Sequence, residues 1–325
     1  MQGSSSLKEY TPKISIIVPV YNESQNIQAF LYKMETVLAN LHISYEIIFC
    51  LDPSTDNSEA IIQQEIERNP NIKLIIFSRR FGQPAATMAG IFYCKGESCV
   101  VIDVDLQDPP ELIIPLYQKL QEGFEVVYAK RRSRQGETLF KRGFAFLGYH
   151  ILNKLSDVNI PPHVGDFRIM TRRVIEELRR LNESHGFLRG LVAYVGFKQT
   201  FIEYDRCERF SGKGNYNRFT GSLKIGLNGL ISFGSRPLQI MSLIGATVAI
   251  FSFLLGAWYV FQKLYGINLT PGLSTTILVI TFFSGIQLLS LGLIGEYIGR
   301  IYDEVKRRPM FIIDKIIENP NQLRG

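Results

Sequence analysis

Residues 99–111 read CVVIDVDLQDPPE, and this stretch joins a short apolar run directly to a cluster of acidic residues. The run Cys99–Ile102 is typical of a buried strand. Asp103 and Asp105 lie two residues apart, so in extended chain both carboxylates project to the same side. Such a pair can hold a hard divalent cation, Mg²⁺ or Mn²⁺, and leave coordination sites for phosphate oxygens, with Gln107 as a further oxygen ligand. The alternative is a solvated acidic loop that precedes a helix.

The same alternation of apolar runs and helical patterns continues on both sides of this stretch. Short β-rich runs separated by helices of about 10–15 residues indicate βαβ units, and hence a mostly parallel sheet with helices on both faces. Ligands bind at the carboxyl ends of strands in such sheets. We therefore expect the loops after Val18, Phe49 and Ile102 to carry the chemistry. The further runs predicted as strands are Ile14–Val18, Tyr45–Phe49, Lys73–Phe77, Glu125–Tyr128, Gly165–Met170 and Thr200–Tyr204.

The chain has 325 residues, of which 20% are charged, a low fraction compared with the about 25% usual for soluble proteins. Two stretches account for the deficit, because Pro237–Gln262 and Leu264–Gly295 contain no Asp, Glu, Lys or Arg. Each is longer than the about 20 residues that cross a bilayer, so together they predict a membrane hairpin. Arg236 and four basic residues within 300–308 flank the pair, whereas only Lys263 lies between its arms, which places both termini in the cytoplasm.

Two loops before the acidic stretch carry polar residues at predicted strand ends. In PVYNE, residues 19–23, we expect Pro19 to end sheet pairing and Tyr21 to contact a nucleobase with its flat face. Glu23 can accept hydrogen bonds from a base or ribose, and Asp52 can accept one from a base N–H such as that of uracil. The alternative for the first stretch is a strand-to-helix loop with Asn22 or Ser24 as N-cap, and in the second loop Ser54 and Asp56 are expected to cap the helix that follows.

Taken together, five motifs resemble the family-2 glycosyltransferases of the GT-A fold, and the likeness covers nearly the whole chain. The branch they resemble most transfers a sugar from a nucleotide donor onto a polyprenyl phosphate. It includes the bacterial bactoprenol glucosyltransferases and, more distantly, the dolichol-phosphate mannose synthases. The motifs are IIVPVYNESQNI (16–27), EIIFCLDPSTDNS (46–58), SRRFGQPAATMAG (78–90), VIDVDLQDPPE (101–111) and YIGRIYDEVKRRPMFII (297–313).

The resemblance implies an α/β fold, in which a GT-A catalytic domain, Rossmann-like with a mostly parallel sheet, precedes a two-helix transmembrane hairpin. The catalytic domain is expected to be cytoplasmic, and the protein to reside in the inner membrane. The predicted segments are a flexible leader at 1–11, a glycosyltransferase domain at 12–217, an interfacial amphipathic helix at 218–235, a hairpin at 236–299 with spans at about 237–262 and 273–298, and a cytoplasmic tail at 300–325.

The resemblance also assigns roles to the donor-side residues by position. The nucleotide pocket is expected to be lined by Pro19, Tyr21, Glu23, Asp52 and Asp103, and the metal and diphosphate to be held by Asp103, Asp105 and Gln107. One departure concerns the second motif. Many relatives have Asp-Asp-Gly-Ser-Thr-Asp where this chain has Leu51-Asp52-Pro53-Ser54-Thr55-Asp56, so the choice of nucleobase stays open.

On the acceptor side, Gly165-Asp166-Phe167-Arg168 resembles the motif that carries the family's general base, which implies that Asp166 is catalytic, with Asp105 and Arg206. An acceptor phosphate has a second pKa near 6, however, and is mostly ionised at neutral pH without a base. Asp166 therefore has an alternative role, to orient groups or to pair with Arg168. The residues expected to contact phosphates are Arg131, Arg132, Arg168, Arg206, Arg209 and Lys213.

The function implied is inverting transfer of a hexose, by default glucose from UDP-glucose, to a polyprenyl phosphate. A dolichol-phosphate-mannose-type or modified-sugar transferase stays open, as does a membrane-anchored sugar-nucleotide sensor or flippase subunit. A processive polysaccharide synthase is excluded, because such enzymes carry Gln-x-x-Arg-Trp in the soluble part and the one tryptophan here, Trp258, lies in the first span. The net charge of +6 concentrates in phosphate-handling loops and membrane flanks, which favours lipid and sugar phosphates over nucleic acid. Relatives imply a homotetramer.

Overall fold

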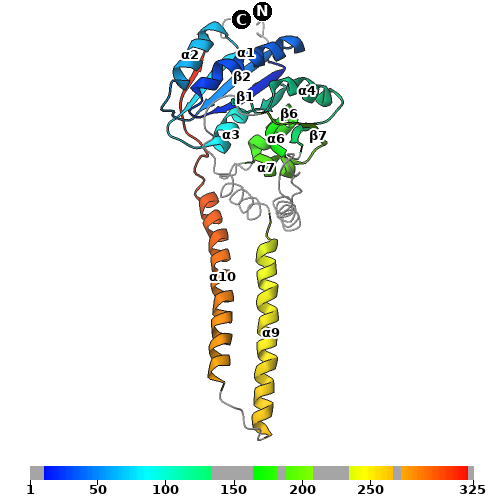
Figure 1. The fold of residues 1–325 in the computed structure, drawn as a ribbon, viewed down its shortest axis with the longest axis vertical. Helices are drawn as coiled ribbons and strands as arrows, with labels where there is room; N and C mark the ends of the chain where they lie inside the picture. Colours follow the sequence, from blue (N-terminus) through cyan, green and yellow to red (C-terminus); the bar gives the residue numbers. More distant parts are fainter. Residues whose placement is uncertain (1–10, 133–163, 182–187, 208–233, 266–271, 321–325) are drawn as a thin grey trace, which may run out of the picture. The chain divides into compact units, whose positions relative to one another are not determined.

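The computed structural model describes residues 11–132, 164–181, 188–207, 234–265 and 272–320 (Figure 1). The chain divides into two compact units, and each is described by itself. The first comprises the described residues up to 207 together with 309–320, and the second comprises the described residues of 234–308. The predicted interfacial helix, and with it Arg209 and Lys213, lies outside the described residues except for its last two positions.

The first unit is built on a sheet of eight strands in the order β7-β5-β6-β4-β1-β2-β3-β8. The pairs β1–β2, β1–β4, β2–β3 and β5–β7 are parallel, whereas β6 runs antiparallel to both β4 and β5. The mixed sheet with a parallel centre confirms the predicted α/β class. The strands are β1 (Ile14–Val20), β2 (Tyr45–Leu51), β3 (Ile72–Phe77), β4 (Ser98–Val101), β5 (Val126–Arg131), β6 (Val164–Thr171), β7 (Gln199–Tyr204) and β8 (Ile313–Glu318).

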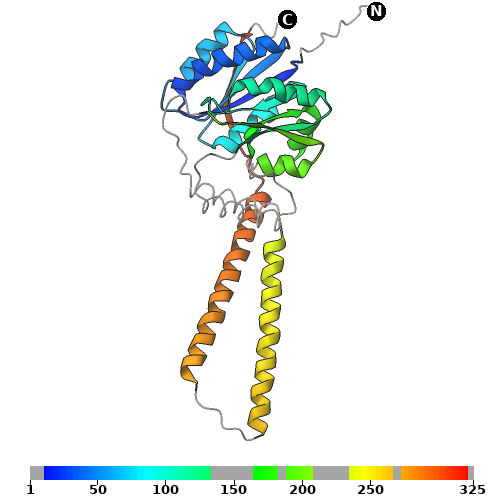
Figure 2. The same ribbon diagram turned by 45° about the vertical axis from the view of Figure 1, so that its right-hand side comes forward.

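Helices cover both faces of this sheet (Figures 1 and 2). One layer contains α1 (Ser24–Leu41), α2 (Ser58–Arg68) and α4 (Ile113–Gln121), the last preceded by a 3₁₀ turn at Pro110–Leu112. The other contains α3 (Gln83–Tyr93), α6 (Arg172–Arg180) and α7 (Leu188–Val195). This arrangement, strands buried between two helical layers, explains why the strands read as continuous apolar runs rather than alternating ones.

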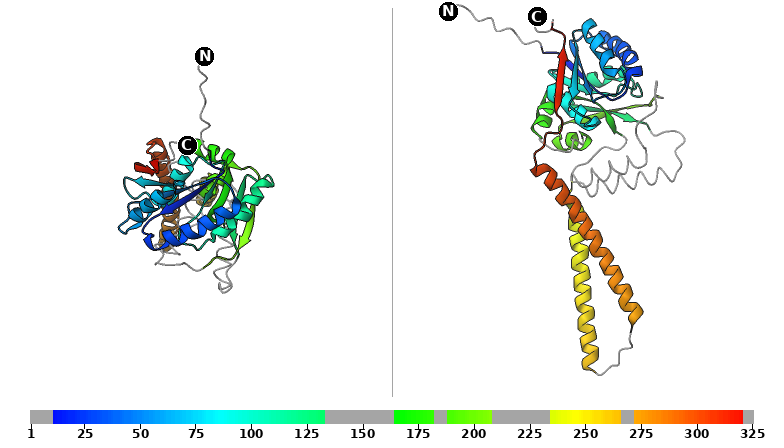
Figure 3. Two further views of the ribbon diagram at one scale, coloured as in Figure 1. Left: turned by 90° about the horizontal axis from the view of Figure 1, so that it is seen from above. Right: turned by 90° about the vertical axis from the view of Figure 1, so that its left-hand side faces the viewer.

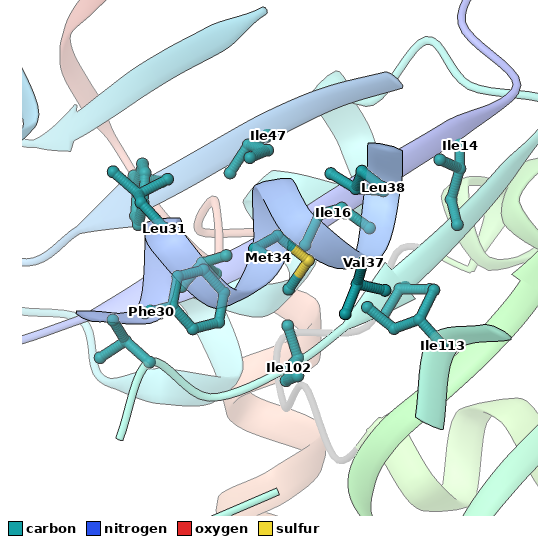
Figure 4. Close-up of a cluster of buried hydrophobic side chains, with 14 of the residues drawn as sticks. Ile14, Ile16, Phe30, Leu31, Met34, Val37, Leu38, Ile47, Ile102 and Ile113 are labelled. Carbon is teal, nitrogen blue, oxygen red and sulfur yellow. The ribbon is translucent and has the colours of Figure 1, made fainter. Parts of the chain in front are cut away.

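The core beneath α1 shows how the sequence pattern produces the packing (Figure 4). Phe30, Leu31, Met34, Val37 and Leu38 recur at helical spacing and are all buried. They lie against apolar side chains of three neighbouring strands or strand ends, labelled in the figure as Ile14, Ile16, Ile47 and Ile102. Burial of each such side chain contributes roughly 1.5–3 kcal/mol, so this face fixes α1, and the loop that leads into it, on the sheet.

Pro19 does not end sheet pairing, and that prediction is wrong. β1 continues to Val20, and its parallel register with β2 includes Pro19 opposite Cys50 and Val20 opposite Leu51. The Ile17 carbonyl accepts a hydrogen bond from the N–H of Ile102, the residue after β4, at 3.1 Å. The backbone nitrogen of Pro19, two residues on, points to the same side of β1. Pairing with β4 ends at Ile17, and the missing proline N–H therefore costs no ladder hydrogen bond.

The C-terminal segment, expected as a tail, contributes a strand to the sheet. β8 pairs antiparallel with β3, from Lys73 opposite Glu318 to Phe77 opposite Ile313 (red arrow in Figure 3, right). The Asn319 side chain donates to the Ile66 carbonyl in α2 at 2.9 Å. The catalytic domain predicted to end at residue 217 therefore also includes a segment after the second span, which completes one edge of the sheet.

The second unit contains two long helices, α9 (Arg236–Leu264) and α10 (Leu273–Val305). The segments Arg236–Trp258 and Val279–Val305 are long and apolar enough to cross a membrane, with mean hydropathy of 2.2 and 1.6. The helices contain the predicted spans, and α10 extends seven residues beyond the predicted end at 298. The Tyr297 hydroxyl donates to the Gly234 carbonyl at 2.7 Å, which ties the end of α10 to the start of α9.

A buried polar network joins β1, β2, β3 and β8 at the amino ends of the central strands. Glu46 is nearly fully buried and accepts a hydrogen bond from the Ser15 hydroxyl at 2.6 Å. Its other oxygen lies 3.2 Å from the Lys73 ammonium, which is also 3.4 Å from Glu318. Buried charges are tolerated when paired and hydrogen-bonded, so this network fixes the register of four strands.

We predict that Glu46→Gln destabilises the protein by roughly 3 kcal/mol, because it leaves the buried Lys73 ammonium with only the partly exposed Glu318. Glu97→Gln is the matched control, since Glu97 pairs with Lys13 at the surface and should change stability little. Denaturant unfolding of the detergent-solubilised protein measures both. Equal losses for the two variants would contradict a stabilising role for the buried network.

Candidate active site at the carboxyl edge of the sheet

Six strands bring their functional ends to one edge of the sheet. β1, β2 and β4 are parallel, so their carboxyl ends lie together. β6 runs antiparallel to β4, with Val101 opposite Arg168, and so it begins at this edge. β5 and β7 end there, with Arg131 opposite Tyr204. β2 lies on one side of β1 in the sheet and β4 on the other, so the strand order reverses at β1. Ligands bind at such switch points in α/β sheets.

The acidic loop after β4 is shaped by its own backbone. The Gln107 N–H donates to the Asp105 carboxylate at 3.1 Å, and Leu106 between them has a positive φ of 58°. The Asp103 carboxylate accepts a hydrogen bond from the Gln83 side chain at 2.8 Å. Asp105 is nearly buried, whereas Asp103 and Gln107 are partly exposed. The predicted pair of carboxylates is therefore held at the strand end with Gln107 beside it.

The charge of this loop suits a divalent cation. Burial, reinforced by the carboxylates of Asp108, Asp105 and Asp166, raises the pKa of Asp103 to about 8. Within the described residues, no group of three or more His, Cys, Asp or Glu side chains is arranged as a metal site. Asp103, Asp105 and the Gln107 amide could supply an all-oxygen set of the kind that fits Mg²⁺ or Mn²⁺.

Asp108 lies at the centre of a cluster that the sequence analysis missed. Its buried carboxylate accepts hydrogen bonds from the Tyr204 hydroxyl and from Arg131, the latter at 3.3 Å and 3.4 Å. The Arg206 guanidinium lies 3.4 Å from the same carboxylate. Arg131 also donates to the Tyr204 hydroxyl at 3.2 Å. These four residues, hereafter the Asp108 cluster, join the loop after β4 to the ends of β5 and β7.

The electrostatics of the Asp108 cluster keep the Arg131 guanidinium charged. Burial lowers the pKa of the Arg131 guanidinium, but the Asp108 carboxylate and the Tyr204 hydroxyl outweigh burial and raise it. Burial and the neighbouring Asp108 carboxylate raise the pKa of Tyr204, so its hydroxyl stays a donor. The predicted phosphate residues Arg131 and Arg206 are thus brought together, both partly exposed. Arg132 lies more exposed, 3.3 Å from Asp205.

Asp166 is held by arginines. Its carboxylate accepts hydrogen bonds from Arg189, at 3.0 Å and 3.5 Å, and lies 3.6 Å from Arg168. Burial raises the pKa of Asp166, but Arg189 and Arg168 outweigh burial and hold it below its usual value. A carboxylate with a lowered pKa is a weak base, so the geometry favours the orienting role over proton removal. Arg189, at the start of α7, carried no motif that would have revealed it.

Arg168 has no exposed surface, so it is not placed to contact a phosphate as expected. Its guanidinium donates to the Gly165 carbonyl at 2.8 Å and the Asp166 carbonyl at 3.2 Å, and lies 5.0 Å from the centre of the Tyr128 ring. These contacts fix the start of β6. We therefore assign Arg168 to the support of Asp166 rather than to the phosphate-binding surface.

The loops after β1 and β2 are hydrogen-bonded to each other. Asn22 accepts from the Thr55 N–H at 2.8 Å and donates its own N–H to Ser54 at 3.0 Å. The Asp56 carboxylate accepts from the N–H groups of Ser24 and Ser58, so it caps the helix that follows, as expected, and also the helix before it. These hydrogen bonds join the two loops beside the carboxyl ends of β1 and β2.

Three residues predicted for the nucleotide pocket already have partners. The Arg80 guanidinium lies 3.8 Å from the centre of the Tyr21 ring. Glu23 accepts a hydrogen bond from Asn26 at 2.5 Å. Asp52 is buried, and its two oxygens accept from the N–H groups of Phe81 and Gly82, both at 2.9 Å. The motif at 78–90 is recognisable in the sequence, but no role was predicted for its β3–α3 loop, which contacts these strand ends.

Comparison with known proteins agrees with this geometry. Glycosyl transferase family 2 matches residues 15–179, and the GtrB C-terminal hairpin matches residues 236–301. The glycosyltransferase YkcC of Bacillus subtilis (strain 168), itself uncharacterized, is 44% identical over 95% of this chain and 96% of its own. The bactoprenol glucosyl transferase of Shigella phage SfII is 40% identical, covering 93% of this chain and 98% of its own. A prophage bactoprenol glucosyl transferase homolog of Escherichia coli (strain K12) is 39% identical, over 94% and 99%.

A mixed sheet of GT-A type, an acidic pair at its switch point, and identity of about 40% with glucosyl transferases along nearly the whole chain all lead to one assignment. The hairpin match and the two apolar helices add that the protein is anchored in a membrane. The chain belongs to glycosyl transferase family 2.

Proposed function

We propose that this protein transfers glucose from UDP-glucose to the phosphate of a polyprenyl phosphate, with inversion at the anomeric carbon. The observation that carries the proposal is the meeting, at one sheet edge, of the Asp103–Asp105 pair with the Arg131 and Arg206 cations. One group suits a metal-bound diphosphate and the other an anionic acceptor. The names of the relatives from Shigella phage SfII and Escherichia coli supply the sugar and the lipid.

The donor side binds and orients the nucleotide. Tyr21 and Glu23 follow β1, and Asp52 follows β2, so these residues border the place where the base and ribose are proposed to lie. Asp103, Asp105 and Gln107 would hold Mg²⁺ or Mn²⁺, which when bound neutralises charge on the diphosphate leaving group. The neighbouring carboxylates of Asp108, Asp105 and Asp166 support this assignment, because their repulsion of Asp103, which contributes to its raised pKa, is relieved by a bound cation.

The acceptor side balances the charge of two phosphates. The acceptor oxygen attacks the anomeric carbon, and the bond to the UDP oxygen breaks with its electron pair leaving on UDP. Arg131 and Arg206 offset the repulsion between the anions, and Asp108 fixes both guanidinium groups before substrate arrives. Asp166 orients Arg189. The more exposed Arg132 is a further proposed phosphate ligand. Arg209 and Lys213 are proposed phosphate ligands from the sequence alone.

The membrane hairpin brings the enzyme to its lipid substrate. The basic flanks of the hairpin support placing the catalytic unit and both termini on the cytoplasmic face of the cell membrane, where nucleotide sugars are available. Small residues in the spans, including Gly245, Gly256 and Gly285, meet nothing within 4 Å of an added Cβ in this chain, which leaves room for helices of further copies in the proposed homotetramer.

The direct test supplies purified protein with labelled UDP-glucose, undecaprenyl phosphate and Mg²⁺. We expect a labelled glucolipid, and we expect Asp105→Ala to lower transfer by at least about 100-fold, because one of the two carboxylates that hold the cation is lost. Asp314→Ala is the control, since Asp314 is exposed on β8. Nucleotide binding without transfer to any polyprenyl phosphate would favour a sensor. Transfer from GDP-mannose instead would move the protein to the mannose branch.

The pH dependence separates the two roles of Asp166. Its pKa lies below the usual value, so the carboxylate is ionised throughout pH 5–9 and contributes no titration there. We expect the rate at low acceptor concentration to rise with pH through about 6, as the acceptor phosphate loses its second proton. Asp166→Asn should lower the rate about tenfold or more through misplaced arginines, and keep the same pH profile. A rise present in the wild type but missing from Asp166→Asn would show that Asp166 is the base.

A further inference from the structure

The loop between β3 and α3, residues 78–82, together with Gln83 at the start of α3, contacts all three strand ends of the donor side. Arg80 lies over the Tyr21 ring after β1. The N–H groups of Phe81 and Gly82 donate to Asp52 after β2, and the Gln83 side chain donates to Asp103 after β4. The conformation of this one loop therefore sets the surroundings of three residues proposed to bind the donor.

The same loop is held from behind by the segment that follows the second span. The Ser78 N–H donates to the Ile312 carbonyl at 3.0 Å, directly after the regular pairing of β3 with β8 shifts register at Phe77. The Phe311 ring packs edge-on against Phe77, with centroids 6.0 Å apart, and against Phe92 of α3 at 6.1 Å. Phe77 in turn packs against Phe81 at 6.1 Å.

These contacts form a continuous path from the C-terminal segment to the donor side. It runs from Phe311 through the buried Phe77 to Phe81, whose backbone N–H is bonded to Asp52. Edge-to-face aromatic pairs fix the relative orientation of their rings. The ring centroids of the two pairs on this path are 6.0 Å and 6.1 Å apart. The loop itself needs such support, because Gly82 adopts a positive φ of 90° and the loop contains no regular secondary structure before α3 begins at Gln83.

We propose that Phe311 is a positioning residue for donor binding: it holds the β3–α3 loop in the conformation that presents Arg80, Asp52 and Gln83 to the nucleotide sugar. The segment after the membrane hairpin is then a working part of the donor side. This inference rests on the proposed donor site. A substitution at Phe311 should therefore weaken binding of the donor and leave binding of the lipid acceptor unchanged.

The test measures UDP affinity by calorimetry on the full-length, detergent-solubilised protein. We expect Phe311→Ala and Phe81→Ala each to weaken UDP binding by about fivefold to tenfold. The double variant should bind UDP no more weakly than the single variant with the lower affinity, because both substitutions interrupt the same path. The donor KM should rise accordingly while the acceptor KM is unchanged. Ile316→Ala on β8 is the matched control and should leave UDP affinity unchanged, since Ile316 is an exposed residue paired with Ile75.

Losses that multiply in the double variant would overturn the proposal, because they show that the two rings act independently. An equal loss in Ile316→Ala would do so as well, because it indicates general destabilisation. Unchanged UDP affinity in folded Phe311→Ala would do so too. If Phe311→Ala does not fold, Phe311→Leu replaces it in the same cycle, since leucine keeps most of the volume and removes the ring contacts. A wild-type protein that binds GDP and not UDP refutes the proposed donor alone, and the cycle then runs with GDP.

Discussion

The carboxylate of Asp108 is the constraint on which the active-site edge depends. It is almost fully buried, and an unpaired charge in that position would be costly, so its partners are obligatory. Those partners come from the ends of β5 and β7, and the Gln107 carbonyl next to it accepts the Cys207 N–H at 3.1 Å. The buried Asp108 carboxylate thus joins the acidic loop after β4 to Arg131 and Arg206, the cations proposed to bind phosphate. The proposed metal ligands and the proposed phosphate ligands therefore occupy different positions along the same sheet edge.

The donor half follows a different principle, in which loops brace one another through backbone hydrogen bonds. Asp52 and Asp56 each accept two N–H groups, and the β3–α3 loop reaches the ends of three strands. These hydrogen bonds restrain the carboxylates of both loops. The acceptor side instead keeps partly exposed guanidinium groups, which suits a phosphate delivered on a lipid.

The parallel centre of the sheet and the two apolar helices could be predicted from local sequence patterns, because buried strands and membrane spans both require unbroken apolar runs. The acidic pair could be predicted because it directly follows one of these runs. Asp108 was hidden because Asp-Pro-Pro is an ordinary helix start, and its partners are 23 to 98 residues away. Arg189 and Tyr204 belong to no motif, and β8 follows a span and has exposed residues on an edge, so its pairing with β3 is visible only in three dimensions. Pro19 was misjudged because the cost of a proline depends on where the neighbouring strand ends.

The most direct measurement is an experimental structure of the full chain with UDP and Mn²⁺, with anomalous scattering used to locate the metal. We expect one manganese bound by the Asp103 and Asp105 carboxylates and the diphosphate, with Arg131 and Arg206 still paired with Asp108 and facing the open side of the diphosphate. A nucleotide or manganese bound away from the carboxyl edge of β1 and β4, with Asp103 and Asp105 contacting neither, would contradict it.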